Sequence, residues 1–261
     1  LIFVTVGTPQ NKTGAIDLSI IKKAMNSLGK SIQKSKKQHT ILVKSTVVPG
    51  TMKDVILPIL ENNSKKKAGK DFGLISNPEF LQESTAIKNT EFPHAVVLGG
   101  YKTKFMKDME KFFTKLHPKT PIIITNHQTA EMIKYANNSF LATKISFINQ
   151  LSNICQKIPG ANIDDIAKTI GLDPRIGKLF LNAGPGYGGS CFPKDTRALV
   201  STSKKFKTNL SIVNSTIYSN DNRYKFLLNK IKLILKNKIK NKQITFLGVT
   251  FKAGTDDMRD S

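Results

Sequence analysis

The first half of the chain alternates short apolar runs with amphipathic segments. Runs of Val, Ile, Leu and Phe predict buried strands over residues 1–6, 40–45, 72–76, 95–98 and 121–125. Between these runs apolar residues recur at helical spacing, which predicts helices over residues 18–32, 52–61, 80–87 and 104–116. Alternating strands and helices with short loops indicate an α/β fold, with βαβ units around a mainly parallel sheet.

The second half has helical patterns and no strand signal before residue 243. A long helix is predicted from Thr129 to about Gln156, where Pro159-Gly160 stops it. Further helices are expected over residues 164–170, 195–206 and 210–235, and a strand over residues 243–249. This arrangement suggests a helical connecting or dimer-forming core, followed by the start of a second α/β unit.

Composition narrows the class of protein. Both ends of the 261-residue chain look cut from within a longer protein, because it starts in a strand without Met and ends just after one. Its two cysteines, Cys155 and Cys191, are far apart and no secretory signal is visible, so we expect a cytoplasmic protein without a disulfide framework. No apolar run has the length of a membrane span, so no membrane association is expected. No metal site is expected.

The formal net charge of +23 raises nucleic-acid binding as a rival function. Two features weaken it: the lysines scatter over loops and helix faces, and arginine, which reads bases and clamps phosphates through its planar fork, is rare. We therefore expect no nucleic-acid partner. A basic nucleic-acid-binding module remains the alternative from a different class, and it would bind DNA or RNA with a steep salt dependence.

The most informative segment is Gly-Pro-Gly-Tyr-Gly-Gly-Ser-Cys-Phe-Pro-Lys-Asp at residues 184–195. Its glycines let the backbone turn and let a ligand approach closely, and they present Cys191 beside Lys194 and Asp195. A thiol that attacks a carbonyl needs such a setting, although a surface turn with a buried cysteine fits equally well on this segment alone. The formal G-x-G-x-x-G match is rejected, because Phe192-Pro193 delays any helix and no acidic residue follows at the required distance.

Five separated strings agree with one known family. They are Lys-Ser-Thr-Val-Val-Pro-Gly-Thr at 44–51, Ser-Asn-Pro-Glu-Phe-Leu-Gln-Glu at 76–83, Glu-Met-Ile-Lys-Tyr-Ala-Asn-Asn at 131–138, Gly-Gly-Ser-Cys-Phe-Pro-Lys-Asp at 188–195, and Phe-Lys at 251–252. In this order they resemble the UDP-glucose 6-dehydrogenase family of nucleotide-sugar dehydrogenases, over essentially the whole chain. The resemblance implies two Rossmann-like domains joined by a long central helix.

On that basis we expect three parts. Residues 1–126 would form a partial NAD-binding Rossmann-like domain that lacks its first, phosphate-binding βαβ unit. Residues 127–220 would form a central helical domain with the cysteine loop, and residues 221–261 the start of a nucleotide-sugar-binding domain. The resemblance also implies a homodimer through the central helix.

The family oxidises a primary alcohol through an aldehyde to a carboxylate, with NAD as cofactor. The resemblance implies that Cys191 is the nucleophile, Asp195 takes the alcohol proton with an ordered water, and Glu79 activates the hydrolytic water. Lys134 and Asn138, one turn apart on the long helix, would stabilise the developing alkoxide and hold a water. Cys155 lies inside an apolar helix pattern and is expected in the core.

Further site residues follow from the same resemblance. Cofactor contacts are expected from Thr8, Thr46, Glu83, Lys194 and Arg259. Substrate contacts are expected from Glu79, Phe80, Leu81, Lys134, Asn138, Phe180, Leu181, Asn182, Ala183, Gly184, Gly188, Phe251 and Lys252. Glu79 and Glu83 would lie on one helix face if Asn77-Pro78 opens a helix.

The sequence leaves the identity of the nucleotide-sugar substrate open. Pro49 stands one position later than in many UDP-glucose enzymes and resembles the GDP-mannose branch, and Asn182 stands where some relatives carry lysine. UDP-glucose, oxidised to UDP-glucuronate, is the leading substrate. GDP-mannose or a UDP-N-acetyl-hexosamine is the alternative.

Overall fold

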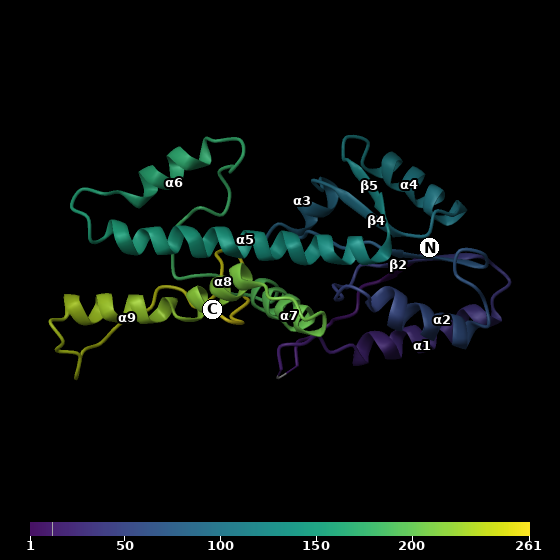
Figure 1. The fold of residues 1–261 in the computed structure, drawn as a ribbon, viewed down its shortest axis with the longest axis horizontal. Helices are drawn as coiled ribbons and strands as arrows, with labels where there is room; N and C mark the ends of the chain where they lie inside the picture. Colours follow the sequence, from purple (N-terminus) through teal and green to yellow (C-terminus); the bar gives the residue numbers. More distant parts are fainter. Residues whose placement is uncertain (12) are drawn as a thin grey trace. The chain divides into compact units, whose positions relative to one another are not determined.

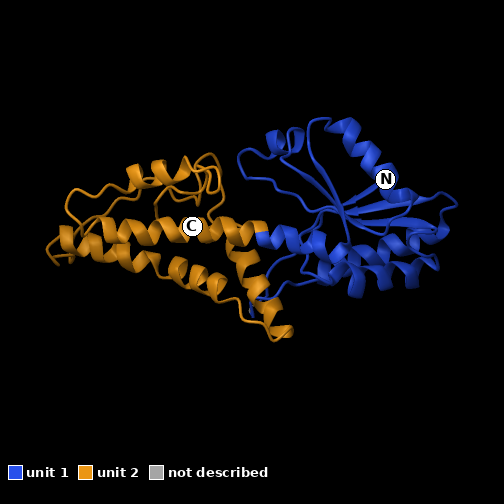
Figure 2. Ribbon diagram, turned by 45° about the horizontal axis from the view of Figure 1, so that its top comes forward, with its two compact units in different colours: residues 1–136 blue, residues 137–261 orange. Residues whose placement is uncertain are grey.

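The computed structural model describes residues 1–11 and 13–261. These form two compact units, residues 1–136 and 137–261, which have different colours in Figure 2. The boundary falls within α5 (His127–Cys155), which confirms the long helix predicted from Thr129 to about Gln156. The division into three domains stays a prediction.

Unit 1 is built on a five-stranded sheet. Its strands, in spatial order, are β1 (Ile2–Val4), β2 (His39–Val43), β3 (Phe72–Ser76), β4 (Val96–Gly100) and β5 (Ile122–Thr125). All neighbouring pairs are parallel except β3 and β4, which are antiparallel. The mainly parallel α/β sheet is therefore confirmed.

Two apolar clusters cover the two faces of this sheet. One joins Ile41 and Val43 of β2 to α1 (Ser19–Lys34) and α2 (Leu57–Ser64). The other joins Leu42, the residue between them, to α4 (Lys104–Leu116). Because successive strand residues face opposite sides, a strand covered on both faces reads as a continuous apolar run. Figure 1 shows α1 and α2 on one side of the sheet and α4 on the other.

A buried carboxylate of α5 binds the segment that follows β2. Glu131 accepts hydrogen bonds from the Gly50 and Met52 backbone N–H groups, each at 2.7 Å, where the π-helical turn η1 (Met52–Ile56) begins. These donors would otherwise be unsatisfied at a helix start. Burial disfavours the charged form more than the two hydrogen bonds favour it, and it raises the pKa of Glu131 from 4.5 to about 7.

This carboxyl gives the fold a pH dependence. Because the folded-state pKa is the higher one, the stabilisation is fully present below pH 4.5 and is lost as pH rises through about 7. We expect the free energy of unfolding to fall over that window, and Glu131→Gln to flatten the fall in urea titrations at several pH values. Glu110→Gln, at an exposed position on α4, is the control and should leave the pH dependence unchanged. Parallel curves for the wild type and Glu131→Gln would contradict this account.

Unit 2 is helical in its described part. It contains the remainder of α5 and four further helices, α6 (Ile163–Gly171), α7 (Phe192–Lys205), α8 (Ser211–Asp221) and α9 (Arg223–Ile234). The expected single helix over residues 210–235 is wrong: the helix ends at Asp221 and restarts at Arg223. The expected delay of α7 is also wrong, because Pro193 occupies its first turn, where a missing backbone N–H costs nothing.

Two other expectations are corrected. Residues 80–87 do not form a helix, because α3 covers Ala86–Glu91 and residues 77–85 are irregular. There the Glu79 carboxylate accepts the Leu81 backbone N–H at 2.5 Å, a local bond that competes with helix formation. Residues 243–249 form no strand, since they have no neighbouring strand in the described chain, and Phe246 and Leu247 are exposed. The predicted start of a second Rossmann-like sheet is therefore not formed here.

Candidate active site

In unit 1 the predicted residues Lys134 and Glu79 form an ion pair. Lys134 is buried on α5, and its Nζ lies 3.1 Å from Glu79 Oε1 and 5.6 Å from the centre of the Phe80 ring. The carboxylate and the aromatic face together compensate the burial of the ammonium group. Lys134, Glu79 and Phe80, each predicted separately as a site residue, therefore lie together, although a loop and not a helix carries the last two.

Lys44 and Asn77 belong to the same cluster, and the sequence analysis did not single them out. Lys44 Nζ donates to Asn77 Oδ1 at 3.2 Å, and Asn77 Nδ2 donates to the Val97 carbonyl of β4 at 2.9 Å. Burial lowers the pKa of Lys44, nearby Glu79 opposes that shift, and Lys134 adds to it. Their only sequence signal was membership of the strings at 44–51 and 76–83.

The other predicted residues of this loop are more open. Glu83 is half-buried at a turn, so it shares no helix face with Glu79. Leu81 is exposed. The Leu81 backbone N–H donates to the Glu79 carboxylate. One carboxylate oxygen of Glu79 therefore binds its own loop and the other binds Lys134.

The carboxyl ends of β1 and β2 form a rim suited to a dinucleotide. The loops that follow them are tied together: Thr8 Oγ1 donates to the Thr46 carbonyl at 2.7 Å, and Ser45 Oγ donates to the Val6 carbonyl at 2.7 Å. A Cβ added at Gly7 would meet nothing within 4 Å, so this backbone is open to a ligand. Ligands of parallel sheets bind at this edge, and Thr8 and Thr46 therefore fit the predicted role of holding NAD.

In unit 2 a buried carboxylate joins three predicted residues. Asp195, in the first turn of α7, is 1% exposed. It accepts from Asn138 Nδ2 on α5 at 2.6 Å and forms an ion pair of 2.5 Å with Lys194 Nζ. Asp195 also lies in the first helical turn, where backbone N–H groups favour negative charge. Lys194, expected to contact the cofactor, is thus engaged with Asp195.

Cys191 stands at the start of the same helix. It is the N-cap residue of α7 and is half-buried, and its Sγ lies 3.5 Å from Ser190 Oγ. The Asp195 backbone N–H donates to the Cys191 carbonyl at 2.8 Å, so the Cys191 and Asp195 residues are separated by one helical turn. Cys155, by contrast, is buried on α5, as predicted for a core cysteine.

The glycine loop before Cys191 packs against the predicted residues near the C-terminus. A Cβ added at Gly189 (φ +77°) would lie 2.6 Å from the Phe251 ring, and one at Gly188 would lie 2.1 Å from the Asp260 carbonyl oxygen. The Gly189 backbone N–H also donates to the Arg259 carbonyl at 2.8 Å. Arg259 thus supports the loop with its backbone, while its guanidinium pairs with Asp257 at 2.7 Å.

The predicted substrate segment precedes this loop. Leu181 is buried, Asn182 is exposed and Ala183 is half-buried. Phe180 has a left-handed backbone (φ 65°), and its ring lies 6.0 Å from that of Phe192 in the first turn of α7. Lys252 is half-buried, and its carbonyl accepts from the Thr250 hydroxyl at 3.0 Å. The segment therefore offers backbone groups and one exposed amide near the cysteine loop.

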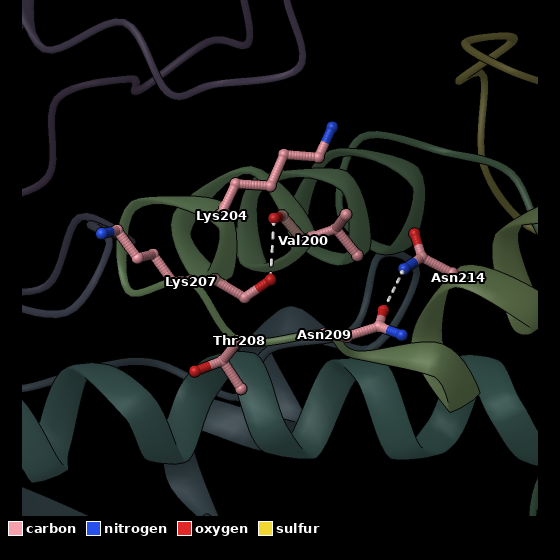
Figure 3. A pocket seen from close by; sticks show the side chains of 7 residues that line it. Val200, Lys204, Lys207, Thr208, Asn209 and Asn214 are labelled. Carbon is pink, nitrogen blue, oxygen red and sulfur yellow. Dashed lines mark hydrogen bonds between the residues drawn. The ribbon is translucent and has the colours of Figure 1, made fainter.

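A separate hollow of unit 2 lies at the end of α7 (Figure 3), with a volume of about 360 Å³. Lys204 and Lys207 extend from it in different directions, so their charges do not converge on one ligand. Within residues 1–11 and 13–261, His, Cys, Asp and Glu side chains form no group suited to a metal ion. In the same ranges none of the helices has the length and apolar character needed to cross a membrane.

Two stretches of the chain match models of one known protein family. Residues 1–117 match the NAD binding domain of the UDP-glucose/GDP-mannose dehydrogenase family, and residues 128–222 match the central domain of the same family. A UDP-glucose 6-dehydrogenase of Rickettsia bellii is 43% identical over all 261 residues, which cover 58% of that protein.

Two solved structures are similar over 99% of the chain. A UDP-glucose dehydrogenase from Pyrobaculum islandicum has 31% identity and a TM-score of 0.90, and a GDP-mannose dehydrogenase from Pseudomonas aeruginosa has 37% identity and a TM-score of 0.64. The chain covers 58% of each. It therefore spans little more than half the length of the relatives it matches. The matched domain confirms the expected Rossmann-like class and supports NAD as the cofactor.

Proposed function

Since the chain belongs to the UDP-glucose/GDP-mannose dehydrogenase family, we propose that it carries the catalytic cysteine of an NAD-dependent oxidoreductase that converts UDP-glucose to UDP-glucuronate. The observation that supports this most directly is the arrangement at the start of α7. There the half-buried Cys191 precedes the buried Asp195, which Asn138 and Lys194 hold by hydrogen bond and ion pair. The reaction would take place in the cytoplasm.

The reaction needs two oxidations of the same carbon. Thr8 and Thr46 would hold NAD at their rim of the sheet, and the bound cofactor would supply the hydride acceptor for each oxidation. In the first, Asp195 takes the proton of the sugar hydroxyl, and the ion pair with Lys194 holds this carboxylate in place. The product of that step is an aldehyde, which cannot lose a second hydride until a nucleophile adds to its carbon.

Cys191 supplies that nucleophile. Its thiolate adds to the aldehyde carbon, and the carbonyl oxygen becomes the hydroxyl of a thiohemiacetal, whose oxidation gives a thioester. A water then attacks the thioester, the C–S bond breaks, and the thiolate is regenerated with the carboxylate product. We assign Glu79 to accept the proton of this water, and Lys134, its ion-pair partner, to stabilise negative charge on the oxygen.

A substrate panel tests this proposal. We expect the full-length enzyme to form two equivalents of NADH per UDP-glucose, with kcat/KM for UDP-glucose above that for GDP-mannose and UDP-N-acetyl-hexosamines. GDP-mannose is the second candidate, because the Pseudomonas aeruginosa relative is the more identical of the two structures described. A higher kcat/KM for GDP-mannose would make GDP-mannose the proposed substrate and leave the proposed reaction unchanged. If no nucleotide-sugar were oxidised, both the proposed substrate and the proposed reaction would be disproved.

We also propose that α5 mediates a homodimer. Phe140, Phe147 and Ile154 recur every seven residues and are 66%, 51% and 58% exposed, so they form one apolar stripe along the helix. An exposed stripe of this kind marks an interaction surface, and a second copy of α5 can cover it with the same residues.

Light scattering of the chain tests the dimer. Phe147→Glu places a charge in the stripe and should weaken dimerisation by at least about tenfold. Phe112→Glu alters an exposed phenylalanine of α4 instead and should leave the dimer intact. A monomeric wild type, or a Phe147→Glu variant that dimerises equally well, would disprove this interface.

A further inference from the structure

Polar side chains that have no role in the proposed reaction form hydrogen bonds with the backbone of the glycine loop, residues 184–191. The Gly184 backbone N–H donates to Asn149 Oδ1 on α5 at 2.7 Å. The Tyr187 N–H donates to Asn220 Oδ1 at 2.8 Å, and Asn220 Nδ2 donates back to the Tyr187 carbonyl at 3.0 Å. Asn149 and Asn220 therefore fix the backbone of the loop at two points.

Arg223 adds a third and more extensive attachment. It is the first residue of α9 and is 7% exposed. Its Nε donates to the Gly184 carbonyl at 2.8 Å, and its Nη2 donates to Ser152 Oγ at 3.2 Å. Its Nη1 donates to the Asn149 carbonyl at 3.3 Å and to Asn153 Oδ1. One guanidinium thus connects the start of the loop to a full turn of α5.

These contacts leave Arg223 little capacity to bind a ligand. A guanidinium has five N–H donors, and the four hydrogen bonds above occupy most of them. A cavity of about 390 Å³ lies beside Arg223, lined also by Phe226, Lys230 and Pro185. The Arg223 Cζ atom lies over the Phe226 ring of that lining, 4.8 Å from the ring centre. An anion entering the cavity would find few free donors on Arg223.

We propose that Arg223 is a positioning residue, which with Asn220 holds the 184–191 loop so that Cys191 is presented in one conformation. The inference rests on the proposed role of Cys191. Asn220 lies near the end of α8, and Arg223 begins α9. Arg223 contacts the loop before Gly186, at Gly184, and Asn220 contacts it after Gly186, at Tyr187.

The loop needs such support because of its composition. Gly186 (φ +119°) and Gly189 (φ +77°) adopt backbone angles that glycine reaches without strain, and the same freedom makes the loop costly to order. Hydrogen bonds to Gly184 and Tyr187 limit that freedom. The planar fork of arginine spans the loop and α5 at once, which a lysine ammonium cannot do.

The test measures loop order and thiol reactivity in the 261-residue chain. In Arg223→Lys we expect amide hydrogen exchange of residues 184–190 to accelerate by about tenfold or more, and the rate of Cys191 alkylation by iodoacetamide to change with it. Lys230→Gln, on the same helix and beside the same cavity, is the control and should change neither. Asn220→Ala should accelerate exchange around Tyr187 without removing a charge.

A turnover measurement completes the test. In the full-length enzyme Arg223→Lys should lower kcat by about 10²-fold, as a misplaced nucleophile does, with the KM for NAD unchanged. Folded Arg223→Lys and Asn220→Ala variants with wild-type loop exchange and alkylation would overturn the proposal. Exchange and alkylation require no turnover, so they decide it even if the dehydrogenase function is disproved. If Arg223→Lys fails to fold, loop exchange and Cys191 alkylation of Asn220→Ala decide the proposal.

Discussion

Replacing Cys191 with serine is expected to abolish formation of the carboxylate product by the full-length enzyme, with a loss of at least roughly 10³-fold in kcat. The reason is chemical: a hydroxyl at the start of α7 is a far weaker nucleophile than a thiolate, so the aldehyde is not captured. The half-buried position of Cys191 gives serine enough room, and the fold should be unchanged.

The measurement follows NADH and the sugar products together. We expect acid formation to stop in Cys191→Ser, while aldehyde, free or enzyme-bound, accumulates up to the enzyme concentration. Cys155→Ala removes the other cysteine, which is buried on α5, and should retain turnover. Acid production by Cys191→Ser at the wild-type rate would rule out the covalent step.

Asp195→Asn is expected to give the second large effect, a loss of about 10² to 10⁴-fold in alcohol oxidation. The substitution keeps the shape of the side chain but removes the proton acceptor. It also leaves Lys194 without its ion-pair partner and places an amide opposite the Asn138 amide, which now donates to Asp195 Oδ2 at 2.6 Å. Two amides can still pair, so the site should stay folded.

A split by substrate distinguishes this role from a structural one. When the aldehyde is supplied directly, no alcohol proton has to be removed, and the Asp195→Asn variant should lose much less activity. Asp165→Asn, at an exposed position in the first turn of α6, controls for a lost carboxylate. Equal losses with alcohol and aldehyde would show that Asp195 only maintains the structure of the loop.

Lys134 and Lys44 of unit 1 contribute to the site through their positive charges. Lys134 and Lys44 both interact with Glu79, Lys134 through an ion pair and Lys44 through its charge. The positive charges of both lysines therefore act on the carboxylate that we propose as the acceptor of the water proton. Lys44 thus belongs to the electrostatics of the site even though its direct partner is Asn77.

Much of the fold could be predicted from periodicity, because in these segments local pattern and tertiary burial agree. β3 was predicted over the residues that form it, and α4 likewise. β3 is a continuous buried run, α4 has a strong apolar period, and core clusters bury both. The failures share a cause. Residues 80–87 have a helical pattern, but the Glu79 carboxylate and Asn89 side chain satisfy backbone N–H groups there and replace the helical bonds.

Sequence by itself determined the α/β class, the long helix and the family, and it singled out Cys191 as the proposed nucleophile, because each depends on residue types at short or fixed spacing. Only the tertiary structure decided that Asp195 is buried between Asn138 and Lys194, and that Arg223 holds the cysteine loop. Asn138 and Asp195 are 57 positions apart, and Gly184 and Arg223 are 39 apart. No local pattern encodes such contacts, since they form when helices pack and buried polar groups must find partners.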